Sequence, residues 1–152
     1  MKIIAHRANL NGPDPKTENS PDQIVKCIDA GYDVEIDIRY DLKTSTLWLG
    51  HDESQYMVTW YWLAEKQNYL CIHCKDISTL HQFSAMTSGY NYFWHHEDDY
   101  TLTSKNNIWA YPGKLYTPNT VIVMPEWNDV NWDKLKVTNC YGICTDYPEK
   151  IK

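Results

Sequence analysis

The chain has 152 residues, of which 43% are hydrophobic and 22% charged, and its formal net charge is -6 at pH 7. This length and composition are typical of one globular domain, residues 1–152, and exclude an intrinsically disordered chain. The acidic balance disfavours nonspecific binding to nucleic acid, which depends on Lys and Arg neutralising phosphates.

Apolar runs in the sequence are too short for a signal-peptide core or a membrane span, so we expect a cytoplasmic protein without stable membrane insertion. Five cysteines, an odd number without secretory context, favour buried reduced thiols over a disulfide framework. The aromatic residues are 12 Tyr and 7 Trp against 2 Phe, which favours rings with a polar edge. Such rings suit a wet cleft or an interface, so a homodimer is allowed, although the sequence names no interface.

The first predicted elements are a strand, a loop, a helix and a second strand. The strand Lys2–Ala5 is followed by a loop over 9–16 that is rich in Gly and Pro. Ser20 then caps a helix that has Pro at its first position and ends at Gly31. The run Asp33–Ile38 alternates acids with β-branched residues, so it predicts a strand whose acids share one face.

A short turn over 41–45 leads directly into a third predicted strand, Thr46–Asp52, with no helix between. Predicted helices at Tyr56–Gln67 and Ile77–Met86 flank a fourth strand, Tyr69–Lys75. Four more strands are expected at Tyr90–His95, Asn107–Tyr111, Thr120–Met124 and Tyr141–Thr145. The connections between these last strands have only marginal helical character.

Strands that alternate with helical intervals favour a parallel sheet in an α/β fold, and about eight of them favour a closed barrel. Such barrels usually need roughly 250 residues. We therefore predict a reduced (β/α)₈ TIM barrel with shortened or missing helices, especially in its second half.

Polar side chains lie at the ends of four of the predicted strands. These are His6-Arg7, Glu35-x-Asp37, His51-Asp52 and His73-x-Lys75. In a parallel barrel every strand delivers its C-terminal end to the same mouth, so these groups should converge. The paired carboxylates can share one hard divalent cation, two histidines supply a proton acceptor and donor, and the two cations suit a phosphodiester's developing charge.

Simpler interpretations compete with several of these assignments. The acids can lie on an exposed edge strand, His51-Asp52 can be a plain turn, and a lysine after a strand is common. The run His95–Asp99 clusters imidazoles and carboxylates, but its spacing matches no zinc pattern, so we favour a polar loop at the mouth with His95 facing the substrate. Cys71-x-x-Cys74 lies on a strand, where its thiols point to opposite faces, so structural thiols are favoured over a redox pair.

Ordered motifs along the chain resemble those of glycerophosphodiester phosphodiesterases. They are Ile4-Ala5-His6-Arg7, Glu18-Asn19-Ser20-Pro21, Ala30-Gly31-Tyr32-Asp33-Val34-Glu35-Ile36-Asp37, His51-Asp52 and Tyr141-Gly142-Ile143-Cys144-Thr145-Asp146-Tyr147-Pro148. Each is weak alone, but their order and spacing together are specific. Because both ends of the chain match, the resemblance implies a complete barrel.

The resemblance implies that Glu35 and Asp37 bind one divalent metal ion and that His6 and His51 form the acid/base pair, with Arg7 on the phosphate. In the family, the fourth strand carries an acidic ligand two residues before a lysine. Here Lys75 is kept, but His73 stands at the ligand position. Mg²⁺ or Ca²⁺ is expected by resemblance, whereas a neutral imidazole shifts preference toward Mn²⁺ or Zn²⁺.

Other residues and departures bear on substrate binding. Glu18, Glu126 and Trp127 are candidates for binding the substrate, the last two because they follow the seventh predicted strand. Glu18 and Glu126 are also alternative third metal ligands. Ala8 replaces the family's usual glycine, which is strained if its φ is positive. The short stretch 52–59 has no room for the small subdomain that family members commonly insert there.

The resemblance implies a small phosphodiester substrate, hydrolysed to a phosphomonoester and an alcohol. One alternative is a lyase-like phospholipid enzyme that stops at a cyclic phosphate, as in relatives of sphingomyelinase D. Another is a catalytically degenerate barrel that only binds a phosphorylated ligand.

Overall fold

The computed structural model describes residues 1–86 and 89–152. Its strands are β1 (Lys2–Ala5), β2 (Asp33–Asp41), β3 (Thr46–Leu49), β4 (Tyr56–Val58), β5 (Leu70–Cys74), β6 (Asn91–Phe93), β7 (Tyr100–Leu102), β8 (Ile108–Ala110), β9 (Thr120–Val123) and β10 (Gly142–Thr145). Its α-helices are α1 (Pro21–Asp29), α2 (Trp60–Lys66), α3 (Ile77–Ala85) and α4 (Trp132–Lys136). Three short 3₁₀ turns are η1 (His6–Ala8), η2 (Pro125–Trp127) and η3 (Pro148–Lys150).

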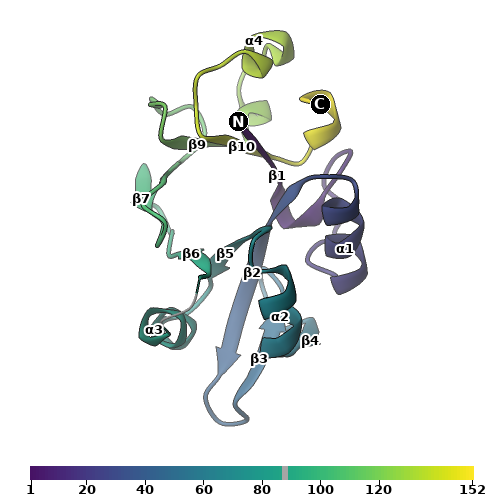
Figure 1. The fold of residues 1–152 in the computed structure, drawn as a ribbon, viewed down its shortest axis with the longest axis vertical. Helices are drawn as coiled ribbons and strands as arrows, with labels where there is room; N and C mark the ends of the chain where they lie inside the picture. The colour runs from purple at the N-terminus through teal and green to yellow at the C-terminus, as the bar shows by residue number, and fades with distance from the viewer. Residues whose placement is uncertain (87–88) are drawn as a thin grey trace.

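The strands form one ten-stranded sheet, which confirms a mixed α/β fold with few helices. Seven of them pair in parallel in the order β6-β5-β2-β1-β10-β9-β8. The sheet curls so that its strands lie around a ring, with α1, α2 and α3 outside it (Figure 1). After α3, the described residues contain only one further α-helix, α4, in agreement with the few helices expected for this part of the chain.

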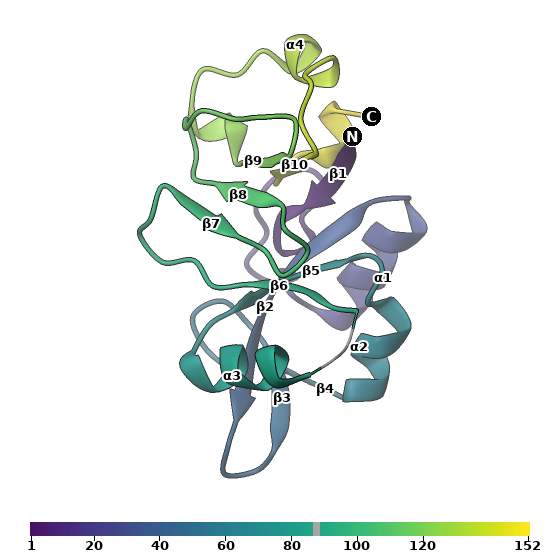
Figure 2. The same ribbon diagram turned by 60° about the vertical axis from the view of Figure 1, so that its left-hand side comes forward.

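The curled sheet is not closed by strand pairing, because β6 and β8 are not paired in the part of the chain that the structure describes. The gap is bridged by Ser104, whose backbone N–H donates to the Tyr92 carbonyl at 2.9 Å and whose Oγ accepts from the Tyr92 N–H at 3.0 Å. The rings of Phe93 and Trp109 also stack across it, with centroids 4.4 Å apart. Figure 2 shows β7 and β8 side by side in this region.

The third predicted strand was wrongly placed in the parallel series. β3 pairs antiparallel with β2, and β4 pairs antiparallel with β3, so the expected helix over 56–67 is shortened to α2. The physical reason is the length of the connection, since a parallel return needs a crossover of a dozen or more residues. Here Asp41 Oδ1 accepts from the backbone N–H of Lys43 at 2.8 Å, which closes a tight turn. The antiparallel strand β7 was also missed.

Two apolar cores lie on the two faces of the curled sheet. The inner face carries a buried cluster that contains Ile4, Cys71, Phe93, Trp109, Val121, Val123, Met124 and Cys144. The outer face carries Val34, Ile36, Ile38 and Ile72, packed with the helical residues Ile24, Leu63 and Phe83. The alternation on β2 therefore turns its apolar side chains outward to the helices and leaves its acids facing inward.

The five cysteines are all free and buried, as the sequence predicted. Cys71 belongs to the inner cluster and Cys74 to the outer one, so they point to opposite faces and cannot form a redox pair. Burial raises the pKa of both thiols to about 12, which makes them inert near neutral pH. No helix in the described ranges has the length and apolar character needed to cross a membrane.

Candidate active site

A pocket of about 460 Å³ opens where the parallel strands end. Its lining residues are His6, Arg7, Glu35, Asp37, Arg39, His51, Asp52, His73, Lys75, His95, His96, Trp109, Tyr111, Pro112, Val123, Met124 and Trp127. Five of the six histidines of the chain are among them. Such concentration of one titratable residue type in a single pocket is typical of a site that moves protons.

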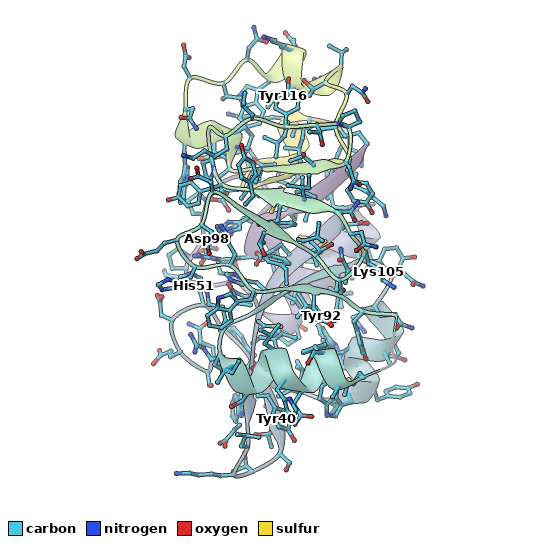
Figure 3. The ribbon with its side chains drawn as sticks, turned by 90° about the vertical axis from the view of Figure 1, so that its left-hand side faces the viewer. Tyr40, His51, Tyr92, Asp98, Lys105 and Tyr116 are labelled. Carbon is cyan, nitrogen blue, oxygen red and sulfur yellow. The ribbon has the colours of Figure 1, made fainter. Side chains whose placement is uncertain are left out.

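The predicted convergence of strand ends holds, although one segment arrives by a different route. His6 directly follows β1, Glu35 and Asp37 lie in the first half and the middle of β2, and His73 lies near the C-terminal end of β5. β2 continues beyond the mouth, and the antiparallel return along β3 brings Gly50 back to Asp37, where its N–H donates to the Asp37 carbonyl at 3.1 Å. His51 follows at once and so reaches the pocket. Figure 3 shows His51 and Asp98 on one edge of the molecule and Lys105 on the opposite edge.

Glu35 and Asp37 are buried carboxylates, 2% and 0% exposed. Asn19, from the loop before α1, accepts a hydrogen bond from the Asp37 N–H at 2.9 Å and donates one to Asp37 Oδ2 at 3.0 Å. Burial and the neighbouring charge of Asp37 raise the pKa of Glu35. For Asp37 burial acts in the same direction, but the adjacent His73 imidazole and the charges of Lys75 and Arg7 outweigh it and hold its pKa below the usual range.

His73 lies beside both acids, with Nδ1 3.2 Å from Asp37 Oδ1 and 3.7 Å from Glu35 Oε1. Its Nε2 is 2.9 Å from the His95 carbonyl oxygen, which can only accept, so Nε2 carries a proton. The ring also stacks on Phe93, with centroids 5.1 Å apart. Nδ1 therefore faces the carboxylates of Glu35 and Asp37. Because Nδ1 and the carboxylate oxygens are all acceptors, a proton or a metal ion has to lie between them.

These three side chains fit a divalent metal ion. One ligand atom each of Glu35, Asp37 and His73 lies within 4.8 Å of the others. Ligands about 2.1 Å from an ion lie roughly 3 to 3.5 Å apart, so little movement is needed. In the part of the chain that the structure describes, the buried Asp37 Oδ1 also accepts no hydrogen bond. His73 thus lies where the sequence predicted a third ligand, and a hydrogen bond to a carbonyl orients its imidazole.

Two cations flank the cluster. Arg7 Nε lies 3.4 Å from Asp37 Oδ2, and Lys75 Nζ lies 3.3 Å from Asp37 Oδ1. Glu18 holds the other side of the guanidinium, with Oε2 3.4 Å from Arg7 Nη1. Glu18, predicted to contact substrate, is placed here as a partner of Arg7.

The segment after β1 has a left-handed backbone. Arg7 has φ 49° and Ala8 has φ 64°, so Ala8 is in the strained conformation that the family's glycine would adopt more easily. This bend turns the Arg7 N–H to Glu35 Oε2 at 3.1 Å. The Ala8 methyl group is completely buried in the outer core.

His6 is held by an acid that the sequence reasoning did not single out. Its Nδ1 lies 2.8 Å from Asp146 Oδ1, and Nε2 lies 4.0 Å from Glu35 Oε2. Burial lowers the pKa of His6, but the hydrogen bond to Asp146 and the charge of Glu35 outweigh it and raise the value. Asp146 lies in the closing motif of the chain, and that match was the available signal. Asn9 fixes it by donating to the same oxygen at 2.8 Å.

His51 has a similar arrangement at the surface, with Nδ1 2.7 Å from Asp52 Oδ1. Arg39, on β2, holds this segment in place, because its Nη2 donates to the His51 carbonyl at 2.6 Å. Arg39 was also missed, although it continues the period-two alternation of Glu35 and Asp37 and so had to face the pocket.

The remaining predicted residues lie farther from the cluster. Glu126 Oε1 accepts from Thr145 Oγ1 and from the Asp146 N–H, both at 2.8 Å, and the pocket lining does not include Glu126. Trp127 does line the pocket and is 63% exposed. In the His95–Asp99 loop, the two histidines line the pocket, and the described residues show no metal cluster there.

Comparisons with known proteins concern the fold. No protein-family model matches the sequence, and no curated protein matches it. The crystal structure of a "putative glycerophosphodiester phosphodiesterase from Galdieria sulphuraria" superimposes with a TM-score of 0.62, covering 99% of this chain and 95% of that chain at 13% sequence identity. The two chains share one fold. This likeness in fold agrees with the resemblance to glycerophosphodiester phosphodiesterases in the sequence motifs. The chemistry depends on the residues of the site.

Proposed function

We propose that the protein is a metal-dependent phosphodiesterase that converts a glycerophosphodiester-like substrate to a phosphomonoester and an alcohol. The observation that carries this proposal is one pocket holding a metal-binding cluster, two cations and two histidines, each paired with its own aspartate. A module that only binds phosphate has no need of two oriented proton-transfer groups.

The aspartate pairing determines which nitrogen acts. Asp146 and Asp52 occupy Nδ1 of His6 and His51, which leaves Nε2 of each ring for proton transfer. A divalent ion held by Glu35, Asp37 and His73 would supply charge neutralisation for the phosphoryl oxygens. Arg7 and Lys75 add to that neutralisation, since both cations line the same pocket.

The family resemblance suggests that the substrate's own hydroxyl, vicinal to the ester, attacks phosphorus. One histidine takes the proton of that hydroxyl while the other donates a proton to the departing alcohol oxygen. The resulting cyclic phosphate is opened by water, with the two histidines in exchanged roles, and yields the phosphomonoester. An enzyme of the lyase type would release the cyclic phosphate instead.

The proposal is tested by comparing two substrates that differ in one hydroxyl arrangement. After chelation and addition of Mn²⁺ or Mg²⁺, the protein should release alcohol from a glycerol phosphodiester, and at least about 100-fold more slowly from the propyl phosphodiester that lacks the nucleophile. Equal turnover of both would rule out attack by the substrate. No turnover of either would favour the binding-only alternative.

We also propose that His73 sets the metal preference, with Mn²⁺ or Zn²⁺ favoured over Mg²⁺ and Ca²⁺ in the parent protein. His73→Glu restores a carboxylate and should move the preference toward Mg²⁺ and Ca²⁺. Metal affinity by calorimetry and activity across the ions should change together. An unchanged ion preference would mean that His73 does not touch the ion.

A further inference from the structure

One part of the pocket is not used by the proposed chemistry. This part, the apolar wall, consists of Trp109, Tyr111, Pro112, Val123, Met124 and Trp127. It is built from β8, β9 and the segments that follow them, whereas the metal cluster is built from β2 and β5. The pocket therefore has one charged side and one apolar side.

An aromatic stack joins the two sides. The His73 ring stacks on Phe93 at 5.1 Å, and Phe93 stacks on Trp109 at 4.4 Å. Phe93 and Trp109 are 2% and 4% exposed, so the stack is held in the inner core, and Trp109 also lines the pocket. A group bonded to a phosphate at His73 consequently has the apolar wall as its neighbour.

The rim of the wall is exposed but held in place. Trp127 is 63% exposed and Tyr111 40%, with ring centroids 6.5 Å apart in an edge-on arrangement. Trp127 ends η2, where its N–H donates to the carbonyl of Met124, a residue with φ 45°. Glu126 anchors the same turn to β10 through two hydrogen bonds of 2.8 Å. Two large rings are thus presented to solvent beside the reacting centre, where a ligand would cover them.

The charges that line the pocket favour a neutral occupant of the wall over a cationic one. Its acidic lining residues are Glu35 and Asp37 in the metal cluster and Asp52 on His51. The described lining places two histidines near the wall and no carboxylate on it. An ammonium group there would find rings but no counter-charge.

We propose, on the basis of the proposed function, that the apolar wall binds the leaving alcohol and that this alcohol is neutral and non-polar, such as an alkyl or benzyl group. The wall then acts as the specificity determinant of the site. Glycerol phosphodiesters with a short alcohol are the weak substrates, and those with a longer apolar alcohol are the strong ones.

The first measurement is kcat/KM for ethyl, butyl, hexyl and benzyl esters of glycerol phosphate. Simple alkanols are leaving groups of similar reactivity. Differences in kcat/KM from ethyl to hexyl therefore measure contact of the alkyl chain with the wall. Each fully buried methylene contributes about a four-fold gain in affinity, and at least a ten-fold rise from ethyl to hexyl is expected for a half-open pocket. If all the alkyl esters were turned over with the same kcat/KM, this inference would be overturned while the proposed function stayed intact.

A matched pair tests charge. Glycerophosphocholine and its uncharged isostere, the 3,3-dimethylbutyl ester, have the same shape. We expect the neutral ester to have the higher kcat/KM. A preference for the choline ester would overturn the inference in favour of cation–π recognition.

Trp127→Ala tests whether the wall causes the preference for longer alcohols. This variant should lower the hexyl-to-ethyl ratio of kcat/KM at least three-fold. Tyr61→Ala removes a ring that is 74% exposed on α2, outside the pocket, and should leave the ratio unchanged. Binding of hexyl and ethyl phosphate, measured by calorimetry, gives the same comparison without turnover. If no ester is turned over, the proposed function fails, and equal binding of the two phosphates would overturn the inference separately.

Discussion

Glu35→Gln and Asp37→Asn are each expected to abolish metal-dependent turnover while leaving the fold intact. Each substitution removes one ligand charge from a cluster of two carboxylates and one imidazole, and water cannot replace that charge. Residual activity should be below about one thousandth of the parental value at limiting metal. Turnover and metal affinity are measured together, with far-ultraviolet circular dichroism as the check on folding.

Asp33→Asn is the matched control, because Asp33 belongs to the same strand but pairs with Lys2 at the opposite end, 2.8 Å away. This variant should keep parental turnover and metal affinity. Activity near the parental level in the Glu35 or Asp37 variant would refute the assigned cluster.

His6→Ala and His51→Ala are expected to lower turnover by roughly two to four orders of magnitude each, the contribution of a positioned acid or base. Binding of the metal ion should change less, because neither ring belongs to the metal-binding cluster. The measurement is single-turnover kinetics at saturating metal and substrate, where the chemical step limits the rate.

His81→Ala provides the control for these variants. His81 is exposed on α3 and is the one histidine of the chain outside the pocket lining, so its loss should leave the rate unchanged. If His6→Ala or His51→Ala kept the full single-turnover rate, that histidine would have a structural role only.

The sequence predicted the parallel core well, since its strands carry strong local patterns. The alternation of residues along β2 predicted that Glu35 and Asp37 share one face, and this is the inward face. The Ser20-Pro21 motif predicted where α1 begins. β3 was misassigned because a strand pattern does not specify its pairing partner. The connection did specify it, since a turn over 41–45 is too short for a crossover.

Within the site, the sequence identified the groups at strand ends but not their supports. Asp146 and Arg39 act on histidines 140 and 12 residues away, and such contacts depend on tertiary packing. Glu126 shows the reverse case. It follows β9 as expected, but it is turned toward β10 by hydrogen bonds to Thr145 and Asp146 that no local pattern encodes.

The most direct measurement is a ³¹P NMR time course of a glycerol phosphodiester with the parent protein, first in chelator and then after Mn²⁺ is restored. The account predicts no change in chelator and, after Mn²⁺, loss of the diester signal with growth of a phosphomonoester signal, preceded by a transient cyclic phosphate. A diester signal that stays constant after metal is restored, or that decays equally in chelator, would contradict the account.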